Sequence, residues 1–96
     1  MPATLLFSDK TIFEDGSIVE IRIWSVPTPV PPSPHRYKYS LYYGLAGKRL
    51  VGFDNEKGKG DHKHVLGIET PYAFVSVPIL LKDFRAEVEA MKGKST

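Results

Sequence analysis

The chain has 96 residues, of which 42% are hydrophobic and 25% charged, and its formal net charge is +2; these values fit one globular domain over residues 1–96 and exclude wholesale disorder. The absence of cysteine excludes disulfides, thiolate nucleophiles and zinc–thiolate sites. No apolar run approaches the roughly 20 residues of a membrane span, and the first residues lack the features of a signal peptide, so we expect a cytoplasmic protein without a membrane partner.

Two strands joined by a tight turn are predicted at the beginning of the chain. The runs at residues 4–13 and 17–26 are rich in apolar and β-branched side chains, and Asp15-Gly16 lies between them. This dipeptide favours a hairpin because both of its residues tolerate positive φ. In the second run, alternate residues from Val19 to Ile23 are apolar and share one face, which we expect to be the core face.

Residues 27–34, with the sequence PTPVPPSP, contain five of the eight prolines of the chain. Proline has no N–H donor and a fixed φ, which excludes a helix and a central strand here. We expect an extended, polyproline-like crossover that joins two parts of one sheet. A ligand for a proline-binding partner domain is the alternative.

The most regular strand pattern lies in residues 36–44. Alternate side chains from Tyr37 to Tyr43 point to one side, the expected core face, and Arg36 and Lys38 point to the other. Basic side chains on an open face suit a nucleic-acid backbone, although they would also keep an exposed strand soluble.

The next part of the chain is expected to continue the sheet as a meander. A turn at residues 45–47 leads into a strand at 48–53, which pairs back on the preceding one. Residues 54–60 are glycine-rich and polar and are expected to form a loop, and residues 62–66 are expected to be extended again.

One long helix is predicted at residues 77–92, with Ser76 as its N-cap and Gly93 as its stop. Its apolar residues recur at spacings of three and four and form a single stripe, which must cover a sheet. They are Val77, Leu80, Leu81, Phe84, Val88 and Met91. The predicted fold is therefore α+β, with an antiparallel sheet of four to five strands (a hairpin plus a meander) packed against one C-terminal helix.

Basic residues are concentrated in the middle of the chain. Residues 35–64 contain seven Lys and Arg against three Asp and Glu, a balance of +4, whereas the remainder has six against eight, a balance of −2. This asymmetry favours an anionic ligand such as RNA, or else reflects a solvated surface. The residues expected to contact phosphates are Arg36, Lys38, Lys48, Lys57 and Lys63, together with the flexible Gly58 and Gly60.

Two histidines stand two residues apart, at His62 and His64. In an extended chain their imidazoles share one face, about 7 Å apart along the strand, and we expect both to face solvent. Histidine serves as acid or base near neutral pH. With Lys59 neutralising developing charge and Asp61 orienting an imidazole, the pair would support metal-independent RNA cleavage without a cofactor, by attack of a ribose 2′-hydroxyl on its phosphate.

Three alternatives remain open for this segment. A metal-dependent nuclease would use the two histidines with Asp54, and Asp61 or His35 would be further candidate ligands. A binding module would hold RNA, the ribosome or a partner protein without chemistry. In a purely structural segment, Asp54 and Asn55 would only support turns and the histidines would only form hydrogen bonds.

The segment RYKYSLYYGLAGKRLVGFDNEKGKGDHKHV and the later ETPYAFVSVPILLKDFRAEV resemble the TumE family, the toxin half of a prokaryotic toxin–antitoxin pair. The upstream DGSIVEIRIWSVP is also similar, so the resemblance covers nearly the whole chain. The family motif falls on Asp54, Asn55, Gly58, Lys59, Gly60, Asp61, His62 and His64.

This resemblance implies a small cytoplasmic toxin that interferes with translation. It also implies a partner, a helix-turn-helix antitoxin encoded beside the toxin. Many small toxins of this kind cleave RNA, which agrees with the chemistry expected of the histidine pair. We therefore expect RNA or the ribosome as the target, with a homodimer as an open alternative to a monomer.

Overall fold

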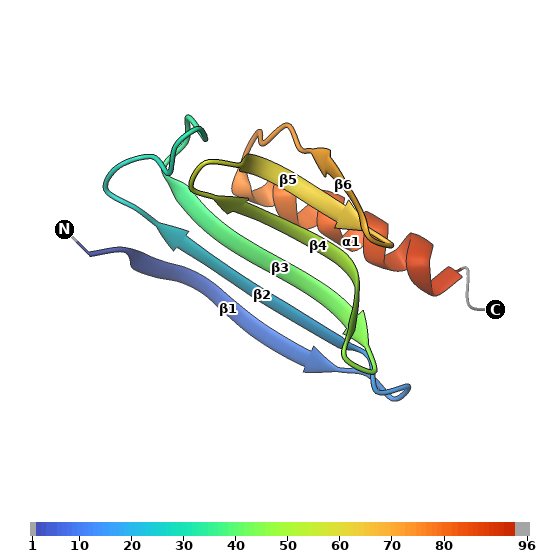
Figure 1. Ribbon diagram of the computed structural model, residues 1–96. Coiled ribbons are helices and arrows are strands. Elements are labelled where there is room, and N and C mark those ends of the chain that lie inside the picture. The colour runs from blue at the N-terminus through green and yellow to red at the C-terminus, as the bar shows by residue number, and fades with distance from the viewer. Residues whose placement is uncertain (1, 94–96) are drawn as a thin grey trace.

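The computed structural model describes residues 2–93, which form a twisted antiparallel sheet backed by a helix (Figure 1). Six strands follow one another across the sheet in chain order. They are β1 (Thr4–Ile12), β2 (Ile18–Ser25), β3 (Tyr37–Leu45), β4 (Lys48–Glu56), β5 (Gly60–Val65) and β6 (Ile68–Pro71). The helix α1 (Val77–Gly93) lies against one face of the sheet. Within the described part of the chain, no helix has the length and apolar character needed to cross a membrane.

The predicted α+β class and the C-terminal helix are confirmed, whereas the sheet has six strands rather than four to five. The additional strand is β6, which has only four residues, all of them exposed. Such a strand lacks the alternation of buried and exposed residues from which strands are predicted. It follows a two-residue turn, Leu66-Gly67, with φ values of 50° and 82°, as tight hairpins require.

The loop expected at residues 54–60 is much shorter, because β4 continues to Glu56 and β5 begins at Gly60. In the turn between them, the Lys59 backbone N–H donates to the Glu56 carbonyl over 3.0 Å. Gly58 and Gly60 have φ values of 87° and 74°, which glycine adopts without strain. The residues on either side of the turn are therefore held in paired strands and not in a flexible loop.

The proline-rich segment at residues 27–34 is a wide hairpin loop rather than the expected crossover, since β2 and β3 are antiparallel neighbours. It folds back on the β4–β5 turn. The Pro31 carbonyl accepts a hydrogen bond from the Gly58 N–H over 2.8 Å, and Ser33 Oγ donates to the Asp61 carboxylate. Two segments that are distant in sequence therefore hold each other in place.

The core lies between α1 and one face of the sheet. It contains most of the residues predicted for the core faces of β2 and β3 and for the helical stripe, and also two residues of β4 for which no core face was predicted, Val51 and Phe53. The other buried members are Ile21, Ile23, Tyr39, Leu41, Tyr43, Leu80, Phe84 and Val88. The remaining predicted core residues, Val19, Tyr37, Val77, Leu81 and Met91, are partly buried. Phe53 and Phe84 meet edge to face with ring centroids 5.9 Å apart, a geometry that aromatic pairs prefer. Ser76 Oγ accepts the Ile79 N–H over 3.3 Å, as expected of the N-cap.

Candidate functional site

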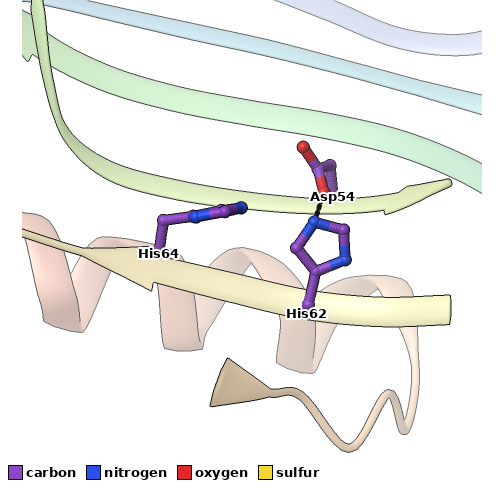
Figure 2. Close-up of side chains that lie close together, drawn as sticks. All are labelled: Asp54, His62 and His64. Atoms are coloured by element: carbon purple, nitrogen blue, oxygen red, sulfur yellow. Dashed lines mark ion pairs between the residues drawn. The ribbon is translucent and has the colours of Figure 1, made fainter. Parts of the chain in front are cut away.

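The two histidines lie on the face of the sheet that points away from α1. Phe53 and Lys63 are paired across β4 and β5 and face the helix, so their neighbours Asp54 and His62, which are also paired, face the other way. Both imidazoles rise from β5 beside Asp54 of β4 (Figure 2). The two ring centroids are 5.0 Å apart. The expectation that the rings share one side of an extended segment therefore holds.

The expectation that both rings face solvent does not hold, because His62 is only 5% exposed and only 13% of the His64 side chain is accessible. His62 Nδ1 lies 2.9 Å from the Gly60 carbonyl oxygen. A carbonyl can only accept a hydrogen bond, so Nδ1 is the protonated nitrogen. The other nitrogen, Nε2, faces the Asp54 carboxylate as an ion pair (Figure 2). Asp54 Oδ1 is buried and accepts no aligned hydrogen bond from the described residues.

A second carboxylate, Glu69 of β6, completes the cluster and was missed in the sequence. Its Oε1 lies 3.4 Å from His62 Nε2 and 3.6 Å from His64 Nε2. The two-residue turn at Leu66-Gly67 is the signal that predicts this arrangement. If residue 65 pairs with residue 68 across such a turn, His64 must stand opposite Glu69, as it does here. We call Asp54, His62, His64 and Glu69 the histidine–carboxylate cluster.

The protonation of His64 is influenced by Arg49, a cation that the sequence did not suggest. Burial lowers the pKa of His64, and the positive charge of Arg49 lowers it further, so the imidazole is neutral at neutral pH. Arg49 reaches this position because Gly52 has no side chain. A Cβ at Gly52 would stand 2.8 Å from Arg49 Cδ. The His64 ring thus offers an unprotonated nitrogen to a proton, a metal ion or a substrate.

An open cavity of ≈ 290 Å³ adjoins the cluster. Its lining consists of Lys59, Asp61, His62, Glu69, Thr70 and Pro71. Lys59 Nζ lies 3.6 Å from Glu69 Oε1, so the predicted cation does stand beside the histidines. The cavity is at the small end of ligand sites, which measure roughly 300 Å³ and more. It gives solvent molecules a route to an otherwise buried His62.

Asp61 does not orient either imidazole, because its carboxylate lies with the core rather than on the histidine face. It accepts hydrogen bonds from Ser33 Oγ and from Tyr39 OH, the latter over 2.7 Å, and His35 Nε2 lies 2.6 Å away. Burial raises the pKa of Asp61, but these three partners outweigh it and lower the pKa below its ordinary value. Phe74 covers His35 with ring centroids 3.9 Å apart. Asp61 is therefore the centre of a buried polar network.

The predicted phosphate-binding cations do not form one surface. Arg36 and Lys57 are exposed at the same end of the sheet as Lys59. Lys48 lies at the opposite end, in the β3–β4 turn. Lys63 faces the helix and pairs with Glu87 over 2.9 Å.

Backbone contacts occupy several of the remaining predicted groups. Lys38 Nζ donates to the Asn55 carbonyl over 2.6 Å. The Gly58 N–H is already bonded to Pro31 and so does not point at a ligand. The Asn55 side chain is fully buried, accepts the Tyr39 N–H over 2.9 Å and donates to the Tyr37 carbonyl over 2.7 Å. Asn55 thus supports the site by fixing β4 against β3.

Comparison with known proteins gives one match. The model of the family described as Toxin TumE matches residues 2–92. No curated protein and no solved structure matches the chain. The matched residues include the whole histidine–carboxylate cluster and all six strands.

Proposed function

The chain belongs to the TumE family of toxins, and we propose that it inhibits translation by cleaving RNA at the histidine–carboxylate cluster. The proposed partner is a helix-turn-helix antitoxin that neutralises it in the cytoplasm. In this reaction the 2′-oxygen of a ribose forms a bond to the adjacent phosphorus and the bond from phosphorus to the 5′-oxygen breaks, which leaves a cyclic phosphate and a free 5′-hydroxyl. The reaction needs a group that removes a proton, a group that supplies one, and positive charge beside the phosphate.

The observation that carries this proposal is the distance of 5.0 Å between the centroids of the two imidazoles, together with an open cavity that His62 and Lys59 both line. The neutral His64 is suited to accept a proton or to bind a cation. The Lys59 ammonium is placed to neutralise charge on a phosphate oxygen. Titratable side chains that cluster beside a cavity are candidates for a functional site, whereas a structural ion pair needs only two of the charged groups present here.

The test compares growth and RNA cleavage for the wild type and the His64→Gln variant. The control is Glu56→Gln, which removes an exposed carboxylate from the same strand as Asp54. We expect the wild type and the control to arrest growth on induction and to cleave labelled RNA, with or without ribosomes. The His64→Gln variant should remain folded and lose both activities. A folded His64→Gln variant that still arrests growth and cleaves RNA would rule out the proposed site.

The burial of His62 favours a second candidate, a toxin that binds RNA or the ribosome without cleaving it. Only 5% of His62 is exposed, so little of its imidazole is open to a substrate, even with the cavity beside Glu69 next to it. A binding toxin would use the exposed cations at that end of the sheet, Arg36, Lys57 and Lys59. Co-sedimentation with ribosomes in the absence of any cleavage product would support this candidate over the first.

A further inference from the structure

We propose that Asp54, His62, His64 and Glu69 bind one divalent first-row transition-metal ion, with Zn²⁺ as the representative cation. The role of that ion in RNA cleavage rests on the proposed function, but its binding does not. The sequence indicated His62, His64 and Asp54 as candidate ligands, but its spacing did not identify a fourth ligand. The structure supplies Glu69 from β6.

The distances between the ligand atoms suit a single small ion. The ligand atoms of Asp54, His62 and His64 all lie within 4.8 Å of one another. In a tetrahedral site with metal–ligand bonds of about 2.0–2.2 Å, neighbouring ligand atoms stand roughly 3.3–3.5 Å apart. Glu69 Oε1 lies 3.4 Å from His62 Nε2 and 3.6 Å from His64 Nε2. Asp54, His62 and His64 therefore form the compact part of the site, and a shift of the Glu69 side chain toward Asp54 would bring a fourth donor to the same ion.

The orientation of His62 is that of a metal ligand. Protein histidines that bind a metal through one nitrogen usually donate the other N–H to a carbonyl or carboxylate, which fixes the tautomer and the ring. Here Nδ1–H donates to the Gly60 carbonyl over 2.9 Å. Nε2 is then directed among carboxylate oxygens, as Figure 2 shows for Asp54. In this arrangement a metal ion can take the place of the proton that an ion pair with Asp54 requires on Nε2.

The burial of the cluster argues in the same direction. Asp54 Oδ1 is buried and faces His62 Nε2 as an ion pair, but it accepts no aligned hydrogen bond from the described residues. A buried carboxylate oxygen without such a bond is destabilising, and a bound cation would offset this cost. A structural ion pair would need only Asp54 and His62. It gives no reason for His64 and Glu69 to converge on the same point.

The donor set indicates the class of ion. Two imidazole nitrogens favour zinc and its first-row neighbours, whereas magnesium and calcium prefer oxygen ligands alone. Glu69 is the most exposed ligand, with 43% of its side chain accessible. It lies at the cavity, so it is the ligand that a water molecule or a phosphate oxygen would replace. Such an exchangeable position is what distinguishes catalytic from structural zinc sites.

The test is metal binding by the full chain after treatment with a chelator. Co²⁺ is added as a spectroscopic probe, Zn²⁺ is added in a calorimeter, and Mg²⁺ serves as the comparison ion. We expect one equivalent of Co²⁺ to bind with the absorption of a nitrogen- and oxygen-ligated ion, displacement by Zn²⁺, and no binding of Mg²⁺ at the same concentration. Affinity should fall about tenfold or more in Glu69→Gln and further in His64→Gln. It should not change in Glu56→Gln.

The outcomes separate the two proposals. A wild type that binds neither Co²⁺ nor Zn²⁺, or a folded His64→Gln variant that binds them as tightly as the wild type, would overturn the metal site. RNA cleavage that continues in EDTA would leave the proposed function intact but remove the ion from it. Metal binding without RNA cleavage or translation arrest would support the metal site and overturn the proposed function.

Discussion

Gly58 donates its backbone N–H to the Pro31 carbonyl over 2.8 Å, and this bond ties the proline-rich loop to the turn that precedes the histidine strand. Gly60, the next glycine in the turn, also lies against the proline-rich loop. A Cβ on Gly60 would stand 3.1 Å from Pro32 Cγ, and the Gly60 carbonyl holds His62 Nδ1. The position of one imidazole therefore depends on a loop that is far away in the sequence.

A first prediction compares alanine at the two glycines of this turn. Both have positive φ, so each Gly→Ala change should lower the free energy of unfolding by about 1 kcal/mol or more. Gly60→Ala should be the more destabilising, because its Cβ also meets Pro32, whereas a Cβ on Gly58 meets no atom within 4 Å. Urea unfolding measures both. Equal losses would show that the Pro32 contact is easily relieved.

A second prediction concerns Asn55, whose amide joins β4 to β3. Asn55→Ala leaves the Tyr39 N–H and the Tyr37 carbonyl without their partner. We expect a loss of about 1–3 kcal/mol in the free energy of unfolding for each buried group that stays unpaired. The control is Glu56→Ala at the next, exposed position, which should change stability by less than about 0.5 kcal/mol. Comparable losses in the two variants would contradict a structural role for the Asn55 amide.

A third prediction separates the roles of Asp61 and the histidines. Asp61→Asn weakens the hydrogen bonds from Ser33, Tyr39 and His35, so we expect the free energy of unfolding to fall by about 2–3 kcal/mol. Because its carboxylate lies on the core side of β5, RNA cleavage per folded molecule should change little. Chemical denaturation and cleavage assays on the same preparation test both statements. An Asp61→Asn variant that is as stable as the wild type but inactive would contradict this prediction and would indicate a catalytic role for Asp61.

A fourth prediction is a dependence of stability on pH from the first hairpin. Asp15 Oδ1 accepts the Ser17 N–H over 2.8 Å and Ser17 Oγ over 2.5 Å, and these bonds lower the pKa of Asp15 below its ordinary value of 3.8. A carboxylate with a lowered pKa stabilises the fold above the unfolded pKa, and this contribution is lost as the pH falls through the folded one. The stability difference between the wild type and Asp15→Ala should therefore be full above about pH 5 and should vanish on acidification below 3.8. Unfolding curves across this range measure it, with Glu14→Ala as the neighbouring control.

Alternation and spacing predicted the core faces of β2, β3 and the helix, but not the buried Val51 and Phe53 of β4. The faces of β2 and β3 followed from period-two patterns such as Tyr39, Leu41 and Tyr43, and the helix followed from its stripe and from Ser76. Strand β6 was not predicted, because its four residues are all exposed and show no alternation of buried and exposed side chains. The proline-rich segment was predicted as a crossover and is a hairpin loop. Proline excludes regular structure, but its presence does not determine the direction in which the chain turns.

Only those parts of the candidate site that lie within strand β5 could be predicted from the sequence. Spacing placed His62 and His64 together, and the same alternation would have put Asp61 on the opposite face. Glu69 and Arg49 come from neighbouring strands, so their positions depend on turn length and on the register between strands, which spacing along one segment does not contain. The burial of His62 likewise results from side chains supplied by other strands.

Among the described strands, β6 forms one edge of the sheet, pairs with β5 and carries Glu69. A protein that captured this short strand and drew it outward would take one donor away from the two imidazoles without touching either ring. An antitoxin that acted in this way would not need to insert any group into the cavity. If the histidine–carboxylate cluster carries the proposed activity, separating these four residues from β5 would switch that activity off, and their return to the sheet would restore it.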